Sequence, residues 1–176
     1  ADGHTALSMG SPELLAEDSF CALLRQNGAA PVQTSTILMR KAAFEAAGGY
    51  RADEDQRCAE DWDMLLRLAS DHRFSGLDQV LVDYRYHEGG ITHDPLLMAQ
   101  GRLQTMLYAR DYPARKACID DRAYDRLLAS RYHVLALVQW SQGDRQAARS
   151  SLRRAVALAP DRASLRRLFI VLSYAF

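Results

Sequence analysis

The sequence predicts an α/β protein, in which part of a mixed sheet is flanked by helices and followed by an all-helical C-terminal segment. Residues 34–39 are rich in β-branched residues, and residues 80–86 alternate apolar and polar side chains; both patterns are typical of strands. From about residue 94 onward only helical periodicity remains. We therefore expect a first domain over residues 1–95 and a helical tail over residues 96–176.

Composition narrows the class of protein. The 176 residues are 48% apolar and 25% charged, as in soluble globular proteins. No apolar run approaches the ~20 residues that cross a bilayer. The 22 basic and 22 acidic residues balance, so nothing favours a nucleic-acid partner. The balance is not local, because residues 1–96 carry a net charge of −8 and residues 97–176 one of +8. This split indicates two segments with different roles.

The three cysteines, Cys21, Cys58 and Cys118, are far apart and form no Cys-x-x-Cys pair. An odd number at such spacing argues against a disulfide framework or a zinc site and indicates a reducing compartment. We expect a cytoplasmic protein, with a peripheral position at the inner face of the membrane as the alternative.

Three helices are predicted in the first half. Ser11-Pro12-Glu13 opens the first with a capping hydroxyl, a first-turn proline and an acidic residue. A short helix over residues 40–47 is ended by Gly48-Gly49. An amphipathic helix over residues 59–70 turns one face to the core and leaves Arg67 in solvent.

Small residues and turn formers follow a pattern in the tail. From Ala129 they fall at Leu135, Ala136, Gly143, Asp144, Ala148, Leu152, Ala155 and Pro160. The pattern resembles one tetratricopeptide repeat over about residues 129–162, with two antiparallel helices, a Gly-Asp turn and small residues where the helices cross. A further helix is expected from Arg162. Because about three repeats are normally needed to bury a core, the tail should pack on the first half.

Three sequence blocks together carry the functional signal. They span residues 34–50, 59–69 and 81–92, and contain Gly-Gly-Tyr, Glu-Asp-Trp-Asp and Tyr-Arg-Tyr-His. In this order and spacing they closely resemble the second half of family 2 glycosyltransferases, which have the GT-A fold. The resemblance covers roughly residues 11–93. It implies an inverting transfer of a sugar from a nucleotide-diphosphate sugar to an acceptor hydroxyl.

The Glu-Asp pair is the candidate catalytic element. The transfer needs a base for the acceptor hydroxyl, and a carboxylate at the first turn of a rigid helix suits that role. Asp61 matches the catalytic aspartate of the family, and Glu60 would hydrogen-bond the acceptor. The alternative is that both carboxylates only stabilise the helix N-terminus. Asp63 lies one step round the helix and is expected in a solvated or capping role.

Four further residues are candidates for binding. Trp62 is either an acceptor platform or a core residue, and Thr36 either binds the acceptor or is simply a good strand former. His87 and Arg85 match a region near the diphosphate and its metal. Imidazole can ligate a metal or donate to a phosphate, although His87 can also just fix the turn. Arg85 can pair with the acidic loop or with the leaving group.

The donor-binding half is missing from this sequence. Asp53-Glu-Asp55 has the letters of the metal-binding Asp-x-Asp signature, but it lies too close to the Glu-Asp helix, and we interpret it as a solvated loop. In the family the true signature, which holds Mn or Mg, lies about a hundred residues upstream, in keeping with usual domain sizes. We expect a piece of a longer bacterial-type enzyme, inactive alone, whose partners are a nucleotide-sugar donor and a glycan or lipid-linked acceptor.

The second interpretation is a non-catalytic protein-binding scaffold that uses the helical tail. Arg145, Arg149 and Arg153, four residues apart, form a basic stripe on one helix face. Such a stripe is usually solvated, and less often docks an acidic protein or a membrane surface. An upstream reading frame with an Asp-x-Asp domain would favour the enzyme.

Overall fold

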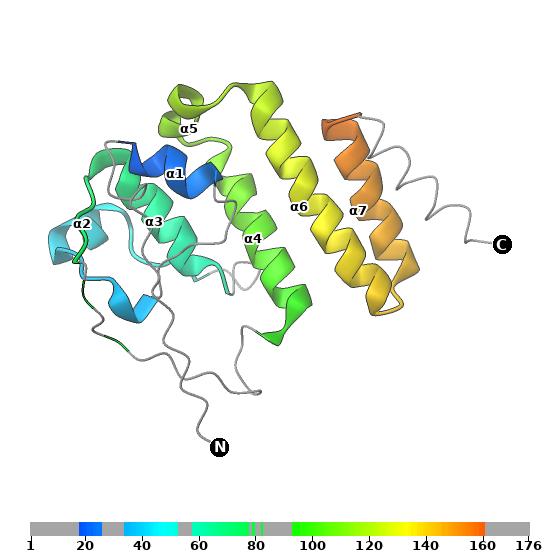
Figure 1. The fold of residues 1–176 in the computed structure, drawn as a ribbon, viewed down its shortest axis with the longest axis horizontal. Coiled ribbons are helices and arrows are strands. Elements are labelled where there is room, and N and C mark those ends of the chain that lie inside the picture. Colours follow the sequence, from blue (N-terminus) through cyan, green and yellow to red (C-terminus); the bar gives the residue numbers. More distant parts are fainter. Residues whose placement is uncertain are drawn as a thin grey trace, which may run out of the picture.

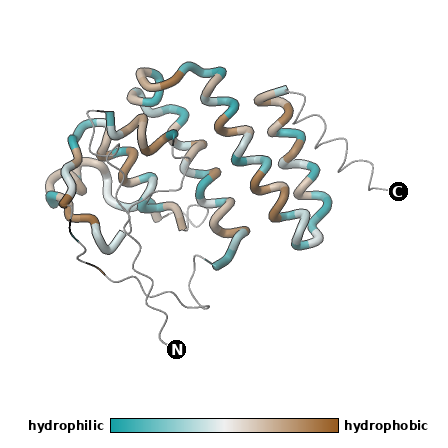
Figure 2. Tube along the Cα trace, viewed as in Figure 1, coloured by the Kyte–Doolittle hydropathy of each residue, from teal (hydrophilic) through white to brown (hydrophobic). Residues whose placement is uncertain are grey.

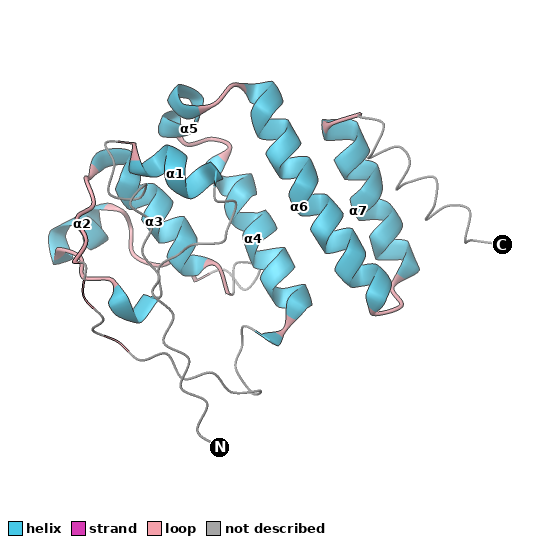
Figure 3. Cartoon of the chain, viewed as in Figure 1, coloured by secondary structure: helices cyan, strands magenta, loops and turns pink. Residues whose placement is uncertain are grey.

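The computed structural model describes residues 18–25, 34–52, 58–77, 79, 82 and 93–160. All secondary structure in these residues is helical (Figure 3). The elements are α1 (Ser19–Arg25), the 3-10 helix η2 (Thr34–Thr36), α2 (Lys41–Ala46), α3 (Glu60–Asp71), α4 (Pro95–Ala109), α5 (Pro113–Cys118), α6 (Asp121–Ser141) and α7 (Arg145–Leu158). Helices α3, α4, α6 and α7 each pack on the next, and in Figure 1 they follow one another across the molecule.

The predicted mixed sheet is wrong for the described residues, which contain no strand. Residues 34–39 form the turn η2 followed by irregular backbone, and the side chain of Leu38 is fully exposed instead of buried. A strand is stable only beside a neighbour that pairs its backbone and covers one face. The second expected strand, residues 80–86, lies outside the described residues except for residue 82.

The resemblance to family 2 glycosyltransferases is therefore wrong as well, since the GT-A fold requires that sheet. The three short blocks are local patterns of residues. The local sequence determines where helices start and where glycine turns form. It does not determine whether distant segments pair into a sheet.

The helices expected in the middle of the first half are confirmed as α2 and α3. Helix α2 ends at Ala46 and is followed by Gly48 and Gly49, whose φ values of +82° and +68° lie in the left-handed region that favours glycine. Of the first predicted helix, the structure describes only α1, where the Asp18 carboxylate accepts from the backbone N–H of Cys21 at 3.0 Å. Its expected start at Ser11 lies outside the described residues.

The helical tail agrees with the sequence up to residue 160. Helices α6 and α7 are antiparallel (Figure 1) and are joined by a turn in which Gly143 has φ +87° and Asp144 caps α7. Ala148 and Ala155 of α7 are fully buried, which lets the two backbones approach closely. In Figure 2 apolar and hydrophilic stretches alternate along both helices, as expected when each has one buried face. The helix expected from Arg162 lies outside the described residues.

One apolar core joins both halves of the chain, so the tail packs on the first half as predicted. Leu24 of α1, Leu66 of α3, Met106 of α4 and Leu128 of α6 belong to one cluster and are at most 1% exposed. The Tyr124 hydroxyl of α6 donates to the carbonyl oxygen of Met106. Within the described segments, no helix has the length and apolarity needed to cross a bilayer.

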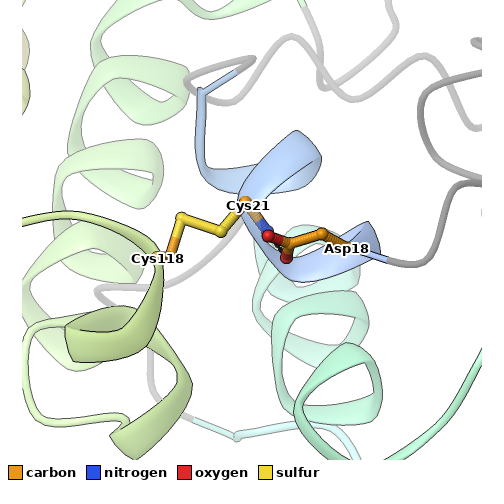
Figure 4. The surroundings of a disulfide bond; sticks show 3 residues. All are labelled: Asp18, Cys21 and Cys118. Carbon is orange, nitrogen blue, oxygen red and sulfur yellow. Dashed lines mark hydrogen bonds between the residues drawn. A yellow bond between two sulfur atoms is a disulfide. The ribbon is translucent and has the colours of Figure 1, made fainter.

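The expectation that the cysteines do not pair is also wrong. Cys21 of α1 and Cys118 at the end of α5 form a disulfide, with their Cα atoms 5.5 Å apart (Figure 4). They are 97 residues apart in sequence. Spacing along the chain could not indicate this pair, because it is the packing of α1 on α5 that brings the cysteines together.

Candidate functional site

Asp61 lies in the first turn of α3, half-buried, and its two carboxylate oxygens have different partners. The backbone N–H of Trp62 donates to Oδ1 at 2.7 Å. The hydroxyl of Thr34 donates to Oδ2 at 3.0 Å across 27 residues of sequence. The first and second sequence blocks therefore meet at this carboxylate. A hydroxyl proton already points at Asp61.

Tyr50 lies in a turn that is tied to α3, because its neighbours Gly49 and Arg51 contact Arg67 and Asp63 of that helix. Partial burial raises the pKa of its phenol, and the negative charges of Asp61 and Glu60 raise that pKa further. The ring contacts the Phe44 ring edge-on, with centroids 5.5 Å apart, and Tyr50 stays 40% exposed. Glu60 is exposed at the start of α3. Two carboxylates, a hydroxyl and an aromatic ring thus gather at the N-terminus of α3.

The other predicted binding residues are distributed differently. Trp62 is 2% exposed, and its Nε1 donates to the carbonyl oxygen of Leu23 at 3.2 Å, so the ring lies in the core with no face open to a ligand. Thr36 is exposed in η2, the same turn as Thr34. His87 and Arg85 lie outside the described residues, as does the acidic triplet at 53–55.

Asp63 is fully buried and accepts hydrogen bonds from three side chains, so its expected solvated or capping role is wrong. Its side chain is 0% exposed and accepts from Arg67 Nε at 2.8 Å, Tyr112 Oη at 2.6 Å and Arg51 Nε at 3.3 Å. Arg67, expected in solvent, has a side chain that is 13% exposed. The physical reason is its i,i+4 position, which puts it on the same buried face of α3 as the carboxylate that neutralises it.

The polar cluster of Asp63, Arg67, Arg51 and Tyr112 holds the turn that carries Tyr50. Arg67 Nη1 donates to the carbonyl oxygens of Ala47 and Gly49, the latter at 2.8 Å. Burial and the hydrogen bond to Asp63 raise the pKa of Tyr112 to about 12, although the Arg51 cation opposes the shift. Sequence reasoning missed this cluster. Its one local signal was the Asp-x-x-x-Arg spacing of 63 and 67.

The described residues do not supply a site for the expected divalent metal. No group of three or more His, Cys, Asp or Glu side chains in them is placed to hold an ion. No family model, curated protein or solved structure matches the chain.

Proposed function

We propose that the chain forms the acceptor-binding side of an enzyme that transfers a sugar from a nucleotide-diphosphate sugar to an acceptor hydroxyl, with Asp61 as the base. The observation that supports this role is the contact between Thr34 and Asp61. A hydroxyl of the chain donates to Oδ2 at 3.0 Å, within the range that proton transfer requires. An acceptor hydroxyl that takes the place of Thr34 Oγ1 would donate to the same oxygen.

In the proposed step the proton of the acceptor hydroxyl passes to Asp61 Oδ2. The acceptor oxygen forms a bond to the anomeric carbon of the donor sugar, and the bond from that carbon to the diphosphate oxygen breaks. The electron pair leaves with the diphosphate. Because attack comes from the side opposite the leaving group, the configuration at the anomeric carbon is inverted. Asp61 Oδ1 stays bound to the backbone N–H of Trp62, which fixes the carboxylate on a rigid helix.

The neighbours of Asp61 suit an acceptor rich in hydroxyl groups. Glu60 is exposed and can accept from a second hydroxyl, and Thr36 lies in the turn that carries Thr34. We propose that the donor sugar is bound by residues other than those that the structure describes. A divalent Mn or Mg ion belongs to that side of the proposal. The residues of the described site fit no such ion, so no step is derived through it.

The test is whether the chain binds sugars at this site. Titration with methyl β-D-glucopyranoside or cellobiose, followed by amide chemical shifts, should perturb residues 34–36, 50 and 60–62. Asp61→Asn should weaken that binding, since the amide loses the charge that attracts hydroxyl donors. Asp71→Asn is the matched control, because Asp71 is exposed in the last turn of the same helix. Equal binding by Asp61→Asn and the unaltered chain would count against the assignment.

A second candidate is a protein-binding helical scaffold, favoured by the basic face of α7. Arg145 and Arg153 are exposed and Arg149 is half-buried. The Arg145 guanidinium also lies over the Trp140 ring, 3.5 Å from its centroid, which orients it. These cations suit an acidic protein segment. A fluorescein-labelled polyglutamate peptide should bind the chain and lose binding when the three arginines become glutamine. Binding to phosphatidylserine vesicles in its place would assign the face to a membrane surface.

A further inference from the structure

Tyr50 differs in kind from the other large apolar side chains that are exposed at the surface. Among the described residues it is the only Phe, Tyr or Trp with a large exposed fraction, at 40%. The others, Leu38, Leu77, Val82, Val134 and Leu137, are aliphatic. An exposed aromatic ring needs an explanation when a polar site lies beside it, because aromatic side chains contribute much of the binding area in ligand sites.

The residues on both sides of Tyr50 in the chain are held in place. On one side the carbonyl oxygen of Gly49 accepts from Arg67 Nη1 at 2.8 Å. On the other, Arg51 donates to Asp63 Oδ2 and to the Tyr112 hydroxyl, each at 3.3 Å, and its guanidinium lies over the Tyr108 ring at 4.4 Å.

Both restraints lead back to the buried carboxylate of Asp63. Arg67 Nε donates to Oδ2 of that carboxylate at 2.8 Å, and Nη2 forms an ion pair with the same oxygen at 2.7 Å, so the buried charge of Asp63 holds the guanidinium in place. At Gly49 an added Cβ would lie 3.5 Å from the Phe44 ring, so the turn also packs closely against α2. These restraints on the turn and the edge-on contact with Phe44 orient the Tyr50 ring before any ligand arrives, which lowers the entropic cost of binding.

We propose that Tyr50 is the stacking platform for the ring of the acceptor sugar, held beside Asp61 and Glu60 by the Asp63–Arg67 pair. The inference rests on the proposed function and assigns to Tyr50 the platform that the sequence suggested for Trp62. A pyranose has one face of C–H groups and a rim of hydroxyls. The electron-rich face of the phenol attracts the C–H groups, and the two carboxylates accept from the hydroxyls.

The chemistry therefore points to a pyranose acceptor and not to an acyclic polyol or a simple alcohol. An acyclic polyol offers the same hydroxyl groups without a rigid C–H face. Tyr50 acts by contact with the sugar, whereas Arg67 is a positioning residue that acts through the turn.

The experiment compares methyl β-D-glucopyranoside with sorbitol by saturation-transfer and amide-shift titration of the whole chain. Tyr50→Ala should weaken binding of the glycoside about tenfold, while Tyr50→Phe keeps the ring and stays within about twofold. Arg67→Lys keeps the charge but has one nitrogen in place of the Nε that donates to Asp63 and the Nη1 that donates to Gly49. It should weaken glycoside binding and move the phenol absorbance titration of Tyr50 toward its ordinary range. Leu38→Ala is the control, because that side chain is fully exposed in the neighbouring segment and should leave binding unchanged.

Each outcome decides the matter. Tyr50→Ala alters a partly exposed side chain and leaves the buried cluster intact, so a folding failure is not expected to obscure the result. If Tyr50→Ala binds the glycoside as tightly as the unaltered chain while Asp61→Asn binds it more weakly, the platform is wrong and the proposed function stands. Sorbitol binding as tightly as the glycoside also overturns the platform. If the unaltered chain perturbs neither ligand, the acceptor site itself fails and the inference fails with it.

Discussion

The α6–α7 hairpin and the region at the start of α3 are stabilised by opposite means. In the hairpin, small apolar residues such as Ala148 and Ala155 are buried between two helices that are neighbours in sequence. At α3, Asp63 collects donors from residues 51, 67 and 112, of which the farthest is 49 residues away. Apolar contact tolerates small adjustments, whereas a buried charge requires every partner to be in place. The α3 region should therefore be the more sensitive of the two to single substitutions.

The largest effect is expected at Asp63. Asp63→Asn keeps the shape but leaves Arg67, whose side chain is 13% exposed, without its counter-charge. Removing one partner of a buried pair costs about 3–5 kcal/mol in the free energy of unfolding. Urea denaturation followed by circular dichroism measures this loss, with Asp71→Asn as the exposed control on the same helix. A loss below 1 kcal/mol, taken as roughly the value of a surface pair, would remove the contrast between the two regions.

Overpacking should disturb the hairpin less. Ala148 is 0% exposed where α7 meets α6, so the extra carbons of Ala148→Leu push the helices apart. We expect a loss of about 1–3 kcal/mol. Ala157→Leu makes the same change at an exposed position of α7 and should be neutral. Thermal unfolding of both variants checks the prediction, and equal melting temperatures would show that the close approach of the helices is not needed.

The same contrast explains how much of each region could be predicted from the sequence. Helix α7 was predictable, because Gly143, Asp144 and the small residues act within a few positions of one another. The ends of α2 and α3 were predictable for the same reason. The role of Asp63 was not, since nothing local indicates that Tyr112 will donate to it. The strand at 34–39 failed because β-branched residues favour a strand only where a partner strand exists.

Alkaline pH should weaken the α3 region through Tyr112. The pKa of Tyr112 rises from 10.0 to about 12, chiefly through burial and then through its hydrogen bond to Asp63, so the folded chain favours the neutral phenol. The contribution of Tyr112 to the free energy of unfolding is fully present below pH 10 and is lost as the pH rises through about 12. Tyr112→Phe should lose about 1.5 kcal/mol near neutral pH, as expected for a hydrogen bond to a charged group. It should also show a shallower alkaline decline than the unaltered chain, measured by urea midpoints, and parallel declines would contradict this assignment.

The smallest effect is expected at the cap of α7. The Asp144 carboxylate accepts from the backbone N–H of Ala147 at 2.9 Å, and the residue is exposed. Asp144→Ala should cost about 1 kcal/mol, because one N–H at the helix start loses its acceptor and water replaces it only in part. Asp144→Asn, which can still cap, should recover most of that stability. Since the change is local, hydrogen exchange should quicken in the first turn of α7 while the amides of α3 keep their protection. Faster exchange in α3 as well would mean that the hairpin and the polar cluster unfold as one unit. The two regions would then differ in the contacts that stabilise them but would not unfold independently.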